Sequence, residues 1–169
     1  MKRPKLKIEK CTFDKVIEIL SFLLIVFSAV VLGFYYNQLP ERVLIDFNWP
    51  SKDENGFAAK GLLWTSPIIC GIIVIAIYKL NQYPWVFNYP SEITEENAEY
   101  NYKMATKMLR IIGLIIALLC FVLTVTAILK GLGNTIRYEH YLMPLFPVLL
   151  IGIPVLFVII LLVQKKKPA

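Results

Sequence analysis

The residues best suited to chemistry lie together in one short segment, Asp46-Phe47-Asn48-Trp49. A carboxylate, an amide and two aromatic rings can recognise a ligand or a protein through hydrogen bonds and apolar contact. We therefore take Asp46, Phe47, Asn48 and Trp49 as candidate ligand- or partner-binding residues.

Oxygen donors in the same region could bind a hard cation, and they are Asp46, Asn48, Asp53, Glu54 and Asn55. Their spacing matches no calcium-binding loop, and Asp, Asn and Gly are also the residues that form turns. His140 is the only histidine, so one chain cannot build a multi-histidine metal site. We expect neither a metal ion nor a cofactor.

The usual sequence signatures of catalysis are missing. The chain has no Gly-rich phosphate loop, no GxSxG and no HExxH. Its three cysteines do not form a disulfide framework, because Cys70 and Cys120 lie in apolar stretches and Cys11 lies in a basic flank. We expect no catalytic residue and a protein that is not an enzyme.

Four long apolar stretches must position these residues. Each approaches the roughly 20 residues that a helix needs to cross a bilayer, and their composition is continuous rather than alternating, which argues against a barrel. The composition, with 57% hydrophobic residues and a mean hydropathy of +0.62, predicts an all-α membrane protein. The lipid bilayer is its first partner, and the predicted spans are residues 16–36, 61–78, 111–129 and 141–163.

The distribution of basic residues predicts the orientation. Thirteen of the 18 Lys and Arg residues lie in the N-terminal segment, the 79–110 connection and the C-terminal tail. The positive-inside rule then places both termini in the cytoplasm and residues 37–60 outside. Basic residues at membrane flanks also explain the net charge of +6 without a nucleic-acid partner.

The two longer connections have different patterns. In the outer loop, residues 37–60, apolar side chains at Val43, Ile45, Phe47 and Trp49 alternate with others, which predicts a short extended segment. In the cytoplasmic connection, an N-cap at Thr94 predicts an amphipathic helix over residues 95–110, continuous with the third span.

A few residues inside the spans invite functional interpretations. Glu18 enters the first apolar stretch and is either a boundary carboxylate or a partner-binding group. Small residues one turn apart, around Gly33 and Gly113, allow close helix contact. Pro154 lies in the middle of the fourth stretch and predicts a kink, either a static bend or a hinge.

Two segments resemble a known family. LPERVLIDFNWPSKDENGFAAK, followed by Pro67, and NYPSEITEENAEYNYKMATKMLR are similar to the domain of unknown function 1648 (DUF1648) of bacterial membrane proteins. The resemblance implies the plasma membrane of a bacterium and the N-terminal domain type of SdpI-like immunity proteins, which protect against a secreted toxic peptide. Asp46 stands where the family pattern shows His.

Three hypotheses about function follow. The first is a non-enzymatic plasma-membrane protein, immunity-like or sensory, that recognises a ligand, peptide or membrane-protein partner through its outer loop. The second is an accessory subunit of a transporter or channel complex, docked through the faces around Gly33 and Gly113. The third is a homo-oligomeric pore, and the sequence does not set the oligomeric state.

Overall fold

The computed structural model describes residues 3–44, 53–136 and 139–164. The described chain contains four helices that are long and apolar enough to cross a membrane. This confirms the predicted helical fold with four candidate membrane spans. These candidate spans are Thr12–Gln38, Lys60–Leu80, Ala98–Gly131 and Pro144–Val163. The α-helices that form most of them are α1 (Thr12–Tyr35), α2 (Thr65–Leu80), α3 (Ala98–Gly131) and α4 (Glu139–Gln164).

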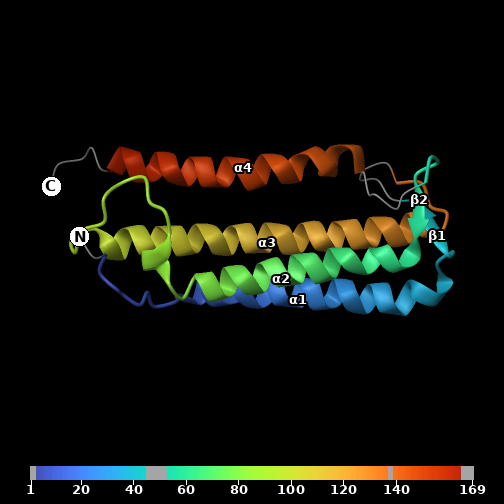
Figure 1. Cartoon of the computed structure of the whole chain (residues 1–169), viewed down its shortest axis with the longest axis horizontal. Coiled ribbons are helices and arrows are strands. Elements are labelled where there is room, and N and C mark those ends of the chain that lie inside the picture. The colour runs from blue at the N-terminus through green and yellow to red at the C-terminus, as the bar shows by residue number, and fades with distance from the viewer. Residues whose placement is uncertain (1–2, 45–52, 137–138, 165–169) are drawn as a thin grey trace.

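The four helices run side by side along the long axis of the molecule (Figure 1). Helix α3 lies in the middle and packs against the other three, whereas α4 packs chiefly against α3. The chain that leads into α1 and the C-terminal end of α4 lie at one end of the bundle, here called the terminal end. A small β-hairpin lies at the opposite end, here called the hairpin end (Figure 1).

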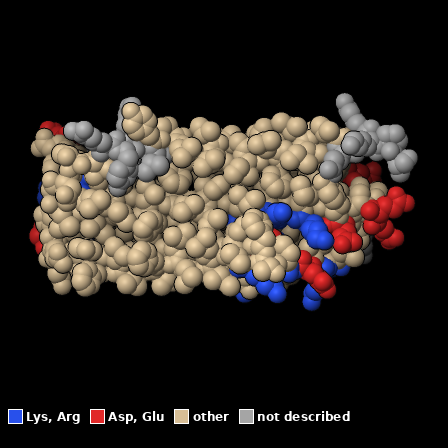
Figure 2. All heavy atoms as spheres, turned by 180° about the vertical axis from the view of Figure 1, so that it is seen from behind, with Lys and Arg blue, Asp and Glu red and all other residues tan. Residues whose placement is uncertain are grey.

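The surface of the bundle separates charge from apolar side chains. Figure 2 shows Lys, Arg, Asp and Glu gathered toward the two ends, with other residue types over the middle of that face. Apolar side chains such as Leu23, Val148 and Ile151 are exposed along α1 and α4. The Ser21 and Ser28 hydroxyls donate to carbonyls of their own helix, which satisfies them without water. This surface supports a multi-pass membrane protein.

The small residues that could serve a partner helix instead serve packing within the chain. A Cβ atom on Gly33 would lie 3.7 Å from Trp64, and one on Gly113 would lie 3.7 Å from Ile77. Each glycine therefore faces a neighbouring helix of the same molecule. A partner subunit would need another face of the bundle.

Helix α3 runs without a break through residues 98–110 of the predicted amphipathic segment and through the third apolar stretch. It begins at Ala98 rather than at residue 95. The Asn97 side chain accepts a hydrogen bond from the Thr94 backbone N–H at 2.9 Å, so residues 94–97 form a turn before the helix. The expected N-cap at Thr94 is therefore wrong by three residues, because Asn97 holds that position.

Helix α4 continues through its three prolines, Pro144, Pro147 and Pro154. Proline removes one backbone donor and disfavours a regular helix interior. The helix nevertheless runs to Gln164, so Pro154 does not end it.

Within the described residues, three short 3₁₀ helices link the longer elements. The first, η1 (Tyr36–Gln38), extends α1, and η2 (Lys60–Trp64) leads into α2. The third, η3 (Pro84–Val86), lies in the connection between α2 and α3.

The hairpin consists of two antiparallel strands, β1 (Arg42–Leu44) and β2 (Phe57–Ala59). Val43 pairs with Ala58, and both side chains point inward and are buried. They join a core cluster with Leu32, Leu39 and Ile128. The predicted alternation holds over β1, and its remaining positions, in residues 45–52, lie outside the described residues.

Candidate functional site

The four residues predicted to bind a ligand or partner, Asp46, Phe47, Asn48 and Trp49, lie outside the described residues. The structure shows the two ends of chain that this segment connects. Residues 45–52 connect Leu44 at the end of β1 to Asp53 ahead of β2. Their attachment points are therefore fixed by the hairpin.

Asp53 organises the return of the chain into β2. Its Oδ1 accepts hydrogen bonds from the backbone N–H groups of Asn55 at 3.0 Å and Phe57 at 2.8 Å. Its Oδ2 lies 2.9 Å from Arg42 Nη2 across the hairpin. Gly56 adopts a φ of 89°, which a side chain would disfavour. Asp53 is thus a turn residue, one of the two roles that the sequence left open.

Lys60 fastens the hairpin to the end of α1. Its Nζ lies 2.9 Å from Glu41 Oε1, donates to the Leu39 carbonyl at 3.4 Å, and lies 5.0 Å from the centre of the Tyr36 ring. The lysine side chain is only 14% exposed. Such a partly buried cation, with three kinds of partner, fixes both sides of the hairpin base.

The hairpin also presses closely on the end of α3. A Cβ atom on Gly131 would lie 2.6 Å from Leu39 Cδ2 and 3.5 Å from Val43 Cγ1. Only glycine allows this approach without a shift of the buried leucine. The hairpin therefore packs directly against the end of the helical bundle.

A pocket of about 490 Å³ opens between the hairpin and the chain that follows α3. Leu44 and Phe57 line one side, Asn134 and Ile136 line the other, and Arg42 contributes to the rim. Leu44 and Phe57 are both exposed apolar side chains. The pocket is open on one side, and it combines apolar walls with a few polar groups, as ligand-binding sites also do.

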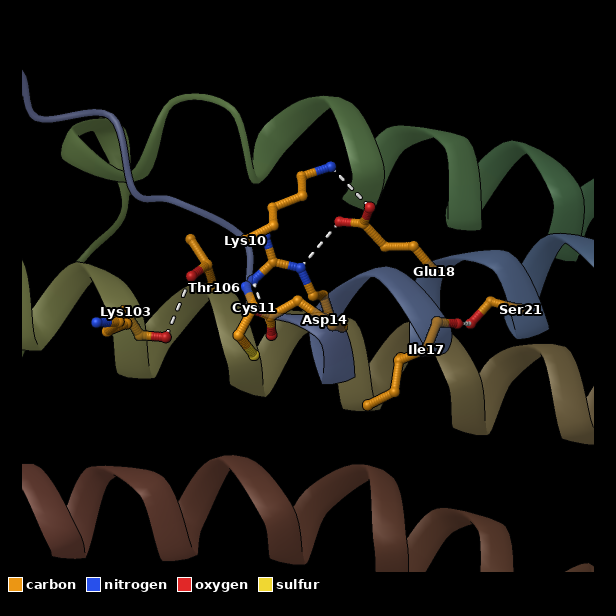
Figure 3. A network of polar contacts seen from close by, with 9 residues as sticks. Lys10, Cys11, Asp14, Ile17, Glu18, Ser21, Lys103 and Thr106 are labelled. Carbon is orange, nitrogen blue, oxygen red and sulfur yellow. Dashed lines mark hydrogen bonds and ion pairs between the residues drawn. The ribbon is translucent and has the colours of Figure 1, made fainter.

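A second polar cluster lies near the terminal end, between α1 and α3 (Figure 3). Arg110 is its centre, with a side chain only 3% exposed. Its Nε donates to Glu18 Oε1 at 2.9 Å, and its Nη1 lies 3.5 Å from Asp14 Oδ1. Glu18 Oε2 also accepts from Lys10 Nζ at 2.7 Å. Two cations thus face two carboxylates.

The backbone and a ring hold the outer members of this cluster. Asp14 Oδ2 accepts a hydrogen bond from the Cys11 N–H at the start of α1. Lys10 Nζ lies 4.6 Å from the centre of the Tyr78 ring on α2. The cluster therefore links α1, α2 and α3 at one level. Removing one member of such a buried group would leave a charge without compensation.

A small cavity of about 20 Å³ adjoins the cluster, and Glu18, Ser21, Asn81 and Arg110 line it. Asn81 is 7% exposed, and neither polar atom of its side chain has a partner among the described residues. The volume suits about one water molecule. Such a water would form hydrogen bonds with the Asn81 side chain, next to the charged cluster.

The N-terminal segment is fastened to the connection between α2 and α3. Tyr102 donates its hydroxyl hydrogen to the Pro4 carbonyl at 3.0 Å, and Arg3 Nη1 donates to the Phe87 carbonyl at 2.5 Å. Tyr89 packs against Tyr102. Burial raises the pKa of Tyr89 above its ordinary value, nearby Tyr102 raises it further, and Arg3 lowers it. Tyr89 therefore remains a neutral hydroxyl that donates to the Pro84 carbonyl.

Sequence reasoning missed the Arg110 cluster. It interpreted Glu18 as either a boundary carboxylate or a partner-binding group, and it counted Arg110 only among the basic residues of the 79–110 connection. The available signal was their equal depth, because each lies near the terminal end of its own apolar stretch.

Among the described residues, no three His, Cys, Asp or Glu side chains lie close enough together to hold a metal ion. No protein-family model, curated protein or solved structure matches the chain. What these sites do must therefore be inferred from their own geometry.

Proposed function

We propose that the chain is a non-enzymatic multi-pass protein of the bacterial plasma membrane that recognises a ligand or partner at its hairpin end. The observation that carries the proposal is the pocket of about 490 Å³ beside the hairpin. The resemblance to DUF1648 suggests an immunity-like or sensory role, with a peptide or a membrane protein as the partner.

The contacts that hold the hairpin on the bundle support recognition at the hairpin end. Lys60, Gly131 and Asp53 each restrain the hairpin through a different contact. A scaffold that is already ordered loses less entropy when it binds, so more of the contact energy appears as affinity. Residues 45–52, which include the carboxylate and two rings of segment 46–49, connect Leu44 to Asp53 of this scaffold.

The orientation belongs to the same proposal. The terminal end carries most of the basic residues, so it faces the cytoplasm under the positive-inside rule. The hairpin end then faces outward, where a secreted peptide would meet it. The Arg110 cluster lies at the cytoplasmic end of α1 and α3. It holds together the two helices whose other ends carry the hairpin.

Deletion of the gene in its native host tests the proposal. We expect greater sensitivity to a secreted toxic peptide if the role is immunity-like, or changed expression of other genes if the role is sensory. The wild-type gene restores the phenotype, whereas Phe57→Ala, which removes a ring from the pocket wall, does not. Leu132→Ala is the matched control, because Leu132 is equally exposed at 39% and does not line the pocket. Unchanged toxin sensitivity together with an unchanged transcriptome would refute the proposal.

A second candidate is an accessory subunit of a transporter or channel complex. The observation that favours it is α4, which packs chiefly against α3 and exposes apolar side chains such as Val148 and Ile151. The faces around Gly33 and Gly113 are occupied within the chain, so α4 is the surface that a partner would cover. Purification in a mild detergent distinguishes the two candidates. A larger membrane protein that elutes with the chain supports the subunit, and a monomer without a partner eliminates it.

A further inference from the structure

An apolar groove of about 270 Å³ lies near the terminal end, between α3, α4 and the connection that precedes α3. Met108 and Leu109 line it from α3, and Phe157 and Leu161 line it from α4. Phe87 and Tyr89 close it on the side of the connection. This groove is on a different part of the molecule from the hairpin pocket and from the Arg110 cavity.

The groove lies where the apolar surface of the spanning helices ends, near the terminal end of the bundle. Leu109 precedes Arg110, the buried cation of the charged cluster, and Leu161 lies one turn before the end of α4. In a bilayer this is the level at which acyl chains meet their head groups. An apolar groove between spanning helices at this level is open to lipid tails rather than to water.

A basic side chain lies beside the groove. Arg3 donates from Nη1 to the carbonyls of Trp85 and Phe87. Its guanidinium carbon lies 5.7 Å from the centre of the Tyr89 ring, so Arg3 touches two of the residues that line the groove. Arginine has five N–H hydrogens, and both of these bonds use Nη1. The remaining donors suit the oxygens of a phosphate.

We propose that this groove binds one anionic phospholipid of the leaflet at the terminal end. One acyl chain lies against Met108 and Phe157, and the phosphate lies at Arg3. Apolar contact alone does not distinguish the groove from the surrounding bilayer, because lipid tails are equally apolar. The selectivity for an anionic lipid therefore comes from Arg3, and the fit of the chain comes from the groove.

Native mass spectrometry of the full chain, released from vesicles of phosphatidylglycerol and phosphatidylcholine in equal parts, tests this proposal. We expect one phosphatidylglycerol on the wild-type protein. Met108→Trp fills the groove and removes the lipid. Val155→Trp adds the same side chain to an exposed site on α4 that does not line the groove, and it keeps the lipid.

Arg3→Gln tests the charge separately from the fit. Arg3 is exposed, so its replacement leaves the bundle folded. We expect the preference for phosphatidylglycerol over phosphatidylcholine to fall about fivefold, the ratio typical of one basic residue near an anionic surface. A preference that stays unchanged contradicts the role of Arg3, even if Met108→Trp does not fold.

Two other results overturn the proposal. A wild-type protein that emerges without lipid shows that the groove does not bind one. A dimer, or a complex with another protein, that Met108→Trp abolishes assigns the groove to a protein partner. Neither result depends on toxin sensitivity or gene expression, so it leaves the proposed function at the hairpin end unaffected.

Discussion

Replacement of Arg110 by Met is the most demanding test of the buried charged cluster. The substitution keeps an unbranched side chain of similar length and removes the charge that faces Glu18 and Asp14. The Arg110 side chain is 3% exposed and that of Asp14 is 8% exposed, so solvent cannot replace the lost partner. Removing one partner from a buried ion pair typically costs about 3–5 kcal/mol. Glu18 retains Lys10 at 2.7 Å, so we expect a loss of about 3 kcal/mol, the lower end of that range.

The assay measures the free energy of unfolding of the purified protein in a mild detergent. Sodium dodecyl sulfate is added in steps, and unfolding is followed by the loss of the helical circular dichroism signal. Arg42→Met is the matched control, because the Arg42–Asp53 pair has the same charges but side chains that are 58% and 33% exposed. We expect it to cost at most about 1 kcal/mol, as exposed pairs do.

A second substitution isolates the cause of the loss. In Arg110→Met, the carboxylate with the least compensation is Asp14, whose remaining partner is the Cys11 N–H. Adding Asp14→Asn removes that charge and keeps an oxygen that can accept the same hydrogen bond. The double variant should therefore recover part of the lost stability. If Arg110→Met costs no more than Arg42→Met, the reasoning that treats this cluster as buried is wrong.

Two further variants test how the ends of the bundle are held. Gly131→Leu should lower the free energy of unfolding by about 1–3 kcal/mol, the cost typical of overpacking, because even its Cβ would lie 2.6 Å from Leu39. Gly152→Ala is its control in the same unfolding assay and should not destabilise, since a Cβ there meets nothing within 4 Å; equal losses for both would contradict the close seat of the hairpin. Tyr102→Phe removes the hydroxyl that donates to Pro4, so it should cost about 0.5–1.5 kcal/mol. It should also speed proteolysis of the N-terminal segment, and an unchanged cleavage rate would mean that this bond does not hold the segment.

The helical part of the fold could be predicted because lipid imposes a simple rule. An apolar stretch of about 20 residues must satisfy its own backbone, and only a helix does so within one segment. The four predicted stretches therefore appear in α1, α2, α3 and α4, with bounds that differ by several residues at some ends. The second stretch begins in the 3₁₀ helix η2, ahead of α2. Helix α3 starts at Ala98 because residues 94–97 form a turn in which the Asn97 side chain accepts a hydrogen bond from the Thr94 N–H, a local choice that propensity alone does not decide.

The contacts between segments could not be predicted from the sequence. Gly131 and Leu39 are distant in the chain, and nothing in either segment indicates that they meet. The pairing of Arg110 with Glu18 depends on the rotation of two helices about their axes, which the apolar stretches leave undetermined. The groove beside Met108 depends on how α4 rests on α3. Asp46, Phe47, Asn48 and Trp49 remain candidates on sequence grounds.

The claim on which the proposed function depends is that the hairpin end faces outward and the terminal end faces the cytoplasm. Labelling of intact cells with a maleimide that cannot cross the membrane tests it most directly. Cys11 is an exposed native thiol at the start of α1, and Glu54 is an exposed position beside β2 that can be changed to Cys. We predict that Glu54→Cys is labelled in intact cells and that Cys11 reacts only after the cells are opened. Labelling of Cys11 in intact cells, with Glu54→Cys protected, would contradict the account.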